Sequence, residues 1–228
     1  MVSCTTLVEP AGRLIAPLRK LLLTLEGCRD IPQIEVAIGE TACVPTSELD
    51  SVLRITLTLR HLQPLSEHDL EQLKTFADEQ GIEWYLQSGG PDTVTRLWPT
   101  TGDDQLHYYM PDALGDITMN FYPGDFTQVN ADINRKMILQ AIDLLDLQPE
   151  DRVLDLFCGL GNFSLPVAKR CASVTGVEGS QDMVERAGIN ASNNNLSNTT
   201  FYAADLFTEF DNTRWAVRAY DKVLLDPP

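Results

Sequence analysis

The feature that most constrains the fold is the run from Val153 to Phe163, which reads VLDLFCGLGNF. Its apolar first half predicts a buried strand, Gly159 and Gly161 predict a tight turn, and a helix is expected over residues 162–169. Small residues in such a turn let the backbone approach a ligand, and a helix start offers N–H groups without an intrahelical partner. The run therefore predicts a ligand-binding turn in an α/β fold.

Strand and helix patterns alternate around this run. A helix fits residues 131–145, and strands fit 152–156, 173–178, 199–203 and 221–226, with a further helix over 181–193. Such alternation favours a parallel sheet with connecting helices. The sequence up to residue 228 predicts only four parallel strands. We therefore expect the first half of a Rossmann-like sheet, in a chain that is a piece of a longer protein.

Residues 1–124 predict a smaller, mixed α/β domain that precedes residues 125–228. The apolar spacing favours a helix over 14–25, and strands over 33–38, 52–59, 83–87, 106–109 and 117–121. Ser66 is placed to cap a second helix, which Gly81 would end. The stretch 88–104 is rich in Gly, Pro, Thr and Asp and is expected to be a loop.

An acidic residue at the end of the next predicted strand adds to the candidate site. Glu178 follows Gly161 by seventeen residues and ends the next predicted strand. A carboxylate there can accept hydrogen bonds from both ribose hydroxyls of an adenosine-type cofactor. At this point a dinucleotide and S-adenosylmethionine both remain open, and each residue taken alone could serve only the turn or a cap.

Three details favour S-adenosylmethionine. Ser164 stands where a dinucleotide-binding turn has its third glycine. Asp155 lies inside the strand end, where a carboxylate can face a cationic cofactor. Asp226 and two prolines follow the fourth predicted strand, beside the candidate ligand site. The prolines stiffen the loop that begins there.

Composition excludes several classes of protein. The formal net charge is −16, and neither half has the clustered Lys and Arg of a free-standing nucleic-acid binder. The five cysteines are widely spaced, with no Cys-x-x-Cys and no local Cys/His pair, which argues against a disulfide scaffold and a local metal site. Cys158 is expected to pack as a small apolar residue. Without a signal segment or a spanning apolar run, we expect a cytoplasmic protein that does not bind membranes.

Together with residues 125–130 (DFTQVN) and 222–228 (KVLLDPP), the run 153–163 resembles the RNA uracil-C5 methyltransferases. It is most similar to the bacterial subgroup that modifies 23S ribosomal RNA and carries an iron–sulfur cluster, and the resemblance extends from Cys4 to Pro228. It implies ribosomal RNA as the partner of the full-length protein, with no role for DNA. The oligomeric state stays open, with a monomer expected.

The resemblance also implies residue roles. The family's S-adenosylmethionine positions correspond to Gln128, Phe157, Asn162, Glu178, Asp205 and Asp226, beside the turn glycines Gly159 and Gly161. The family's nucleophilic cysteine and its base would lie beyond residue 228, so this chain contains no catalytic residue and is expected to be inactive alone. Cys4 resembles the fourth ligand of a 4Fe–4S cluster whose other three ligands would precede Met1, so a cluster is expected only in the full-length parent.

Other functions remain open on the sequence. The chain could belong to a methyltransferase for another base or a small molecule. Without the nucleophile it could be a non-catalytic RNA- or protein-binding module. A nicotinamide-dependent dehydrogenase is the remaining alternative, disfavoured by Ser164 in the glycine position.

Overall fold

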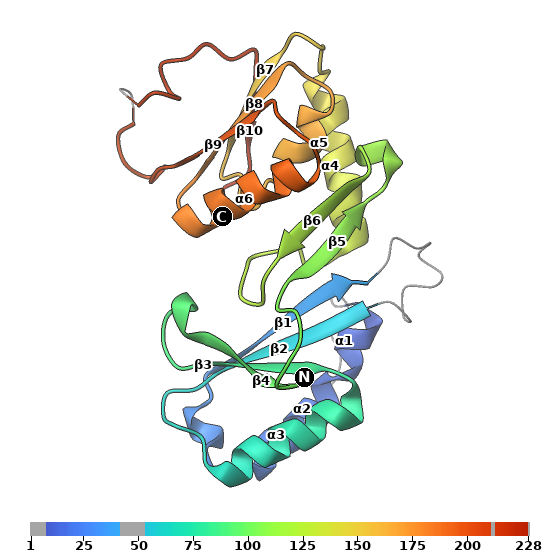
Figure 1. Cartoon of the computed structure of the whole chain (residues 1–228), viewed down its shortest axis with the longest axis vertical. Coiled ribbons are helices and arrows are strands. Elements are labelled where there is room, and N and C mark those ends of the chain that lie inside the picture. The colour runs from blue at the N-terminus through green and yellow to red at the C-terminus, as the bar shows by residue number, and fades with distance from the viewer. Residues whose placement is uncertain (1–7, 42–52, 211–212, 228) are drawn as a thin grey trace. The chain divides into compact units, whose positions relative to one another are not determined.

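A computed structural model describes residues 8–41, 53–210 and 213–227 (Figure 1). The chain divides into two compact units. The first contains residues 1–107 and 122–130, and the second contains residues 108–121 and 131–228. The chain therefore crosses between the units more than once, and the domain boundary expected after residue 124 stays a prediction.

The first unit is a four-stranded sheet covered by helices. The strands are β1 (Gln33–Glu40), β2 (Leu53–Arg60), β3 (Glu83–Gln87) and β4 (Val94–Trp98), in the order β1-β2-β3-β4. Only the β2–β3 pair is parallel. The helices are α1 (Glu9–Arg13), α2 (Ile15–Thr24) and α3 (Glu67–Gln80), with short 3-10 turns η1 (Cys28–Asp30) and η3 (Pro91–Thr93).

The caps of α3 follow the sequence signals. The Ser66 hydroxyl accepts a hydrogen bond from the Asp69 N–H at 3.2 Å, and Gly81 ends the helix with φ of 65°. Leu73, Phe76 and Ala77 of α3 then lie buried in one core with α2 and the strands. Both predicted helix signals are confirmed here.

The loop expected over 88–104 is wrong in its middle, because residues 94–98 form β4. Arg96 of that strand is paired with Glu83 at 2.8 Å and with Asp104 at 2.7 Å, and its guanidinium lies 4.8 Å from the Tyr85 ring. These partners come from β3 and from the chain beyond β4. The strand therefore depends on pairings that its own turn-rich composition does not reveal.

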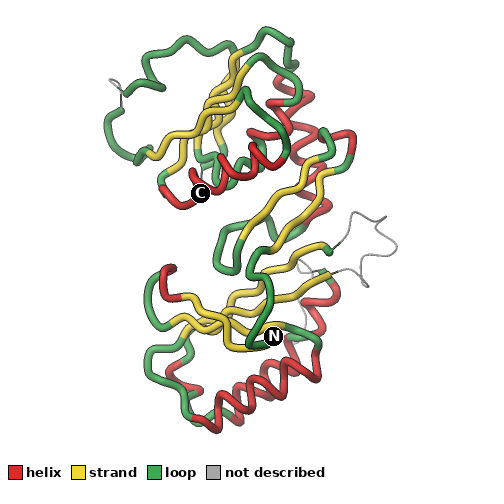
Figure 2. The backbone as a smooth tube through the Cα atoms, in the orientation of Figure 1, coloured by secondary structure: helices red, strands yellow, loops and turns green. Residues whose placement is uncertain are grey.

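A two-stranded hairpin, β5 (Leu106–Met110) and β6 (Ile117–Phe121), is joined by η4 (Asp112–Leu114) and belongs to the second unit from Tyr108 onward. The later elements of this unit are α4 (Ala131–Leu145), β7 (Arg152–Leu156), α5 (Ser164–Ala168), β8 (Ser173–Glu178), α6 (Gln181–Asn193), β9 (Thr199–Ala203) and β10 (Lys222–Leu225). Figure 2 shows how these strands and helices alternate along the chain. The predicted alternation is thus confirmed, with shifts of a few residues at the ends of α5 and β10.

Four of these strands form a parallel sheet in the order β10-β7-β8-β9. The chain runs from β7 outward to β9 and returns to place β10 on the other side of β7. This is the strand order of a Rossmann-like half sheet, which confirms the fold class. Trp215, from the long β9–β10 connection, packs against Leu154 and Val177 and buries one part of the sheet.

No helix among the residues that the structure describes is long and apolar enough to cross a membrane.

Candidate cofactor site

The order of the strands marks where a ligand can bind. The order in which the chain adds strands to the sheet reverses at β7, whose neighbours are β8 and β10. In open α/β sheets, ligands bind beyond the carboxyl ends of the strands at such a point of reversal. Four sequence-predicted residues lie at these ends: Phe157 after β7, Glu178 ending β8, Asp205 after β9 and Asp226 after β10. The parallel register therefore gathers residues from four separate segments at one edge.

The turn after β7 has an unusual backbone. Phe157, Gly159 and Gly161 have φ of 64°, 52° and 90°, a region that L side chains rarely adopt. A Cβ on Gly161 would lie 2.4 Å from Leu165 Cδ1, so this glycine allows α5 to pack closely. A Cβ on Gly159 would meet nothing within 4 Å. The backbone at Gly159 is thus open on one side, as a turn that approaches a ligand must be.

Glu178 holds this turn from the neighbouring strand. Its Oε2 accepts the Gly159 N–H at 3.1 Å, and its Oε1 accepts the Ser180 N–H at 3.1 Å. An ionised carboxylate has about four acceptor positions, so two remain for a ligand. The ribose role expected for Glu178 is compatible with this geometry and stays a prediction.

Asp155 is the buried acid of the site. Its side chain is 2% exposed, and its Oδ2 accepts the Ser164 hydroxyl at 2.5 Å. Its Oδ1 is buried without a hydrogen-bond partner among the described residues. Burial, with a smaller contribution from the charges of Asp226 and Glu178, raises the pKa of this carboxyl to about 7 despite the hydrogen bond from Ser164. A cationic ligand group nearby would relieve both the repulsion and the unpaired oxygen.

An aromatic pair connects the ends of β7 and β9. The rings of Phe157 and Phe207 lie 5.6 Å apart with an interplanar angle of 54°. Phe207 is nevertheless 81% exposed. The Asp205 carboxylate accepts the Phe207 N–H at 2.9 Å and so fixes the start of this loop. Sequence reasoning missed Phe207, although its place two residues after Asp205 was an available signal.

Asn162 does not begin a helix, contrary to the prediction for residues 162–169. The chain forms turns through Phe163, and α5 spans only Ser164–Ala168. Gly161 donates its N–H to the Cys158 carbonyl at 2.9 Å, which closes the turn before Asn162. The Asn162 side chain instead bonds to Asn134 and Tyr108, two residues that sequence reasoning did not select.

Gln128 and Cys4 are the two remaining predicted site residues. Gln128 belongs to the first unit and is half-buried there, and its cofactor role stays a prediction. Cys4 lies outside the described residues, so its proposed ligand role stays a prediction as well.

Cys158 packs inside the turn. It is 5% exposed, and burial raises the pKa of its thiol well above the ordinary value. A thiol held protonated in this way is a poor nucleophile, which confirms the interpretation of Cys158 as a packing residue. Within the described ranges, no group of three or more His, Cys, Asp or Glu side chains could hold a metal ion.

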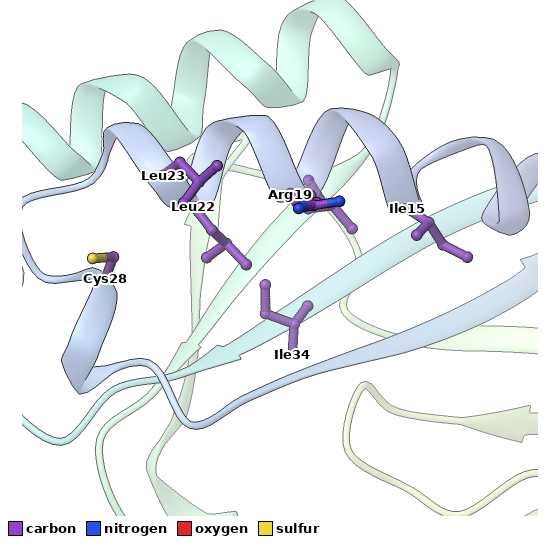
Figure 3. A pocket seen from close by; sticks show the side chains of 7 residues that line it. Ile15, Arg19, Leu22, Leu23, Cys28 and Ile34 are labelled. Atoms are coloured by element: carbon purple, nitrogen blue, oxygen red, sulfur yellow. The ribbon is translucent and has the colours of Figure 1, made fainter. Parts of the chain in front are cut away.

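A groove of about 470 Å³ lies in the first unit, between α2 and the start of β1 (Figure 3). None of the sequence-predicted site residues lines it. The side chains around it are mostly apolar: Ile15, Leu18, Arg19, Leu22, Leu23, Cys28 and Ile34. Its chemistry does not match the polar strand-end site of the second unit.

Comparison with known proteins identifies the family. Residues 96–225 match the sequence profile described as tRNA (Uracil-5-)-methyltransferase, which is more than half of the chain. The chain belongs to the tRNA (uracil-5-)-methyltransferase family. The resemblance noted in the sequence is thereby confirmed.

Curated relatives of this family extend the match over the whole chain. The chain is 47% identical over 99% of its length to the 23S rRNA (uracil(1939)-C(5))-methyltransferase RlmD of Hahella chejuensis, and 46% identical over 99% to that of Alcanivorax borkumensis. In both cases the match covers 48% of the relative. The chain therefore spans about half the length of these uracil-5-methyltransferases.

A solved structure of the family shows the same fold. It is a tRNA (uracil-54, C5)-methyltransferase of Pyrococcus abyssi in complex with S-adenosyl-L-homocysteine, with a TM-score of 0.55 and 20% identity. The match covers 77% of this chain and 40% of that one. At this identity the likeness supports the methyltransferase fold alone.

Proposed function

We propose that the chain is the cofactor-binding portion of an S-adenosylmethionine-dependent RNA uracil-C5 methyltransferase that acts on 23S ribosomal RNA. The observation that carries this proposal is the 47% identity to a 23S rRNA uracil-C5 methyltransferase over nearly the entire chain. The strand-end site supplies independent support, because its groups suit the proposed cofactor.

The residues of the second unit fit S-adenosylmethionine. When bound, this cofactor supplies an electrophilic methyl group on a sulfonium. Asp155, with an unpaired buried Oδ1, and the exposed Asp226 provide negative charge for the cationic end of the cofactor. Glu178 retains acceptor positions for the ribose, and Phe157 with Phe207 offers an apolar surface beside it. Asp205 is assigned to the adenine side, and Gln128 is carried over from the family resemblance.

Catalysis is assigned to the longer protein. Methyl transfer to uracil C5 needs a thiolate that adds to C6 and a base that later removes the C5 proton. Cys158 is buried with a raised pKa, and Cys171 is also buried, with its pKa raised to about 11. Neither is suited to the nucleophile's role. Because the family's nucleophilic cysteine has no counterpart in this sequence, we propose that the 228-residue chain alone does not methylate RNA.

The remaining assignments also concern the full-length parent. We propose that it acts in the cytoplasm on ribosomal RNA, and that Cys4 contributes to a 4Fe–4S cluster together with cysteines absent from this chain. One thiolate cannot replace four, so the chain alone is proposed to assemble no cluster. A monomer is the proposed oligomeric state.

Two measurements test the proposal. Calorimetric titration of the chain with S-adenosylhomocysteine should show binding, whereas titration with NAD should show none. Incubation with labelled S-adenosylmethionine and unmodified ribosomal RNA should leave no label in 5-methyluridine, while the full-length protein should incorporate it. Binding of NAD in preference to S-adenosylhomocysteine would overturn the cofactor assignment. Label incorporated by the chain alone would return Cys158 to consideration as the nucleophile.

A further inference from the structure

The side chain of Asn162 is held by two residues far away in the sequence. Its Oδ1 accepts hydrogen bonds from Tyr108 Oη at 2.9 Å and from Asn134 Nδ2 at 2.9 Å. Its Nδ2 donates to Asn134 Oδ1 at 2.9 Å. An amide oxygen has two lone pairs, so both acceptor positions of Asn162 are used within the protein. A ligand can reach only its second amide hydrogen.

The pairing of Asn134 with Asn162 is reciprocal and partly buried. Asn134 is 5% exposed on the inner face of α4, and each amide donates to the other. A buried amide that loses its partner pays the cost of desolvation without a compensating bond. The pair therefore favours one orientation of Asn162 and of the turn that carries it.

Tyr108 is itself fixed by its surroundings. It lies on β5, whose partner strand is β6. Side chains of α6 and of its C-cap residue bond β6: Asn190 bonds both backbone groups of Asn120, and Asn194 bonds both of Thr118. From the other side, Arg135 of α4 donates to the Tyr109 carbonyl at 2.8 and 3.0 Å. The hydroxyl of Tyr108 thus reaches Asn162 from a hairpin held by both helices.

We propose that Tyr108 and Asn134 are positioning residues for the turn 157–163, and that both act through Asn162. The inference rests on the proposed cofactor function and adds to it the source of the turn's rigidity. In this arrangement Asn162 contributes by holding the turn open at Gly159, where a Cβ would meet nothing within 4 Å, rather than by offering its side-chain oxygen to the cofactor. A preorganised turn binds its ligand without having to be ordered first.

The test combines Tyr108→Phe and Asn134→Ala with an Asn162→Ala background. Amide hydrogen exchange of residues 158–163 is measured without ligand, and the affinity for S-adenosylhomocysteine is measured by calorimetry. Each single variant should speed local exchange and weaken affinity by roughly 2- to 10-fold, the range for one neutral hydrogen bond. In the Asn162→Ala background, Tyr108→Phe should change neither quantity further, because the residue through which it acts is gone.

Asn193→Ala, an exposed asparagine on α6, is the matched control and should leave both quantities unchanged. Unchanged exchange in Tyr108→Phe, or an effect that persists undiminished in the Asn162→Ala background, would overturn the proposal. Faster exchange with unchanged affinity would also overturn it. If Asn134→Ala does not fold, the test rests on Tyr108→Phe, because that variant removes only the hydroxyl oxygen and is expected to fold. Absence of S-adenosylhomocysteine binding by the unmodified chain would refute the proposed function, while the exchange data would still decide whether these residues hold the turn.

Discussion

Glu178 and Gly159 are joined across neighbouring strands, with the Glu178 Oε2 accepting the Gly159 N–H at 3.1 Å. The other oxygen of the same carboxylate accepts the Ser180 N–H at the start of α6. One side chain therefore connects the turn after β7 with the loop after β8. Glu178, which the sequence predicts to bind the ribose, therefore also fixes the backbone at Gly159 and Ser180.

Glu178→Ala should consequently affect both binding and stability. If Glu178 accepts hydrogen bonds from the ribose hydroxyls, affinity for S-adenosylhomocysteine should fall by about 1.5–3 kcal/mol, or roughly 10- to 150-fold. The two backbone N–H groups lose their acceptor as well, but water can reach this half-buried position. We expect the free energy of unfolding to fall by only about 1 kcal/mol. Calorimetry and urea unfolding measure the two effects.

Glu185→Ala is the control for this experiment, because Glu185 is an exposed acid on α6 whose partner is Gln181. It should change neither quantity appreciably. A folded Glu178→Ala chain with undiminished affinity would remove Glu178 from the cofactor site.

Asp155→Asn should stabilise the chain increasingly as the pH rises from about 4 to about 7, and the gain should persist at higher pH. The pKa of Asp155 is about 7 in the folded chain, above its ordinary value, so the folded state binds the proton more tightly than the unfolded state does. Stability from this group is complete below about pH 4 and is lost as the pH rises through about 7. The asparagine stays neutral and can still accept from Ser164. Its advantage should be absent at low pH and reach on the order of 2–4 kcal/mol by pH 8.

Urea unfolding of both chains between pH 5 and 8.5 measures this difference. A gap between the two that stays constant with pH would show that Asp155 does not titrate in this range.

The turn and the parallel sheet could be predicted because their signals are local. The apolar residues of the strand 152–156 and the glycines Gly159 and Gly161 lie within a few residues of the strand and the turn that they determine. The start of α5, which follows Phe163, could not be predicted correctly from such local signals. Phe163 has helical φ and ψ but offers no capping bond, so the helix begins later than expected.

The partners of Asn162 could not be predicted, because they lie 28 and 54 residues away in the sequence. Nothing local distinguishes Asn134 from the exposed polar residues of a helix. The strand β4 was missed for the same reason, since Arg96 takes its charge partner from β3. Pairings of this kind are set by the register of the sheet, and composition does not encode register.

Cofactor affinity should follow the protonation of Asp155. A cationic ligand group is favoured by the ionised carboxylate, and the free chain holds this group protonated below about pH 7. Affinity for S-adenosylhomocysteine, which carries an ammonium group, should therefore decrease as the pH falls from 8 to 6, by up to about tenfold per pH unit below the pKa. Asp155→Asn should bind more weakly at pH 8 and show a flatter profile. Parallel profiles for the two chains would contradict a role for Asp155 in binding.

Phe207→Ala should weaken binding without destabilising the fold. The ring is 81% exposed and contacts Phe157, so its removal leaves no cavity in the core. We expect an affinity loss of roughly 0.5–1.5 kcal/mol, the range for an aromatic contact, and a change in unfolding free energy within about 0.5 kcal/mol. Leu144→Ala, at a residue of similar exposure (79%) on α4, serves as control. Equal affinities of the two variants would exclude Phe207 from the site.

Asn190→Ala should be the most damaging of three asparagine substitutions on α6 and at its C-cap. The Asn190 side chain is 1% exposed, and it bonds the N–H of Asn120 at 2.9 Å and its carbonyl at 3.0 Å, in the manner of a neighbouring strand. Its removal leaves these groups of β6 without partners where water has little access, which costs on the order of 2–3 kcal/mol.

Asn194→Ala removes the same pattern of bonds at Thr118, but Asn194 is half-buried, so water can replace it and about 1 kcal/mol is expected. Asn193→Ala, on the exposed face of the same helix, should change the free energy of unfolding by less than about 0.5 kcal/mol. The urea midpoints of the three variants, compared at an unchanged m-value, rank their free energies of unfolding. Equal midpoints for Asn190→Ala and Asn193→Ala would show that β6 does not depend on α6, and would remove the support that the hairpin gives to Tyr108.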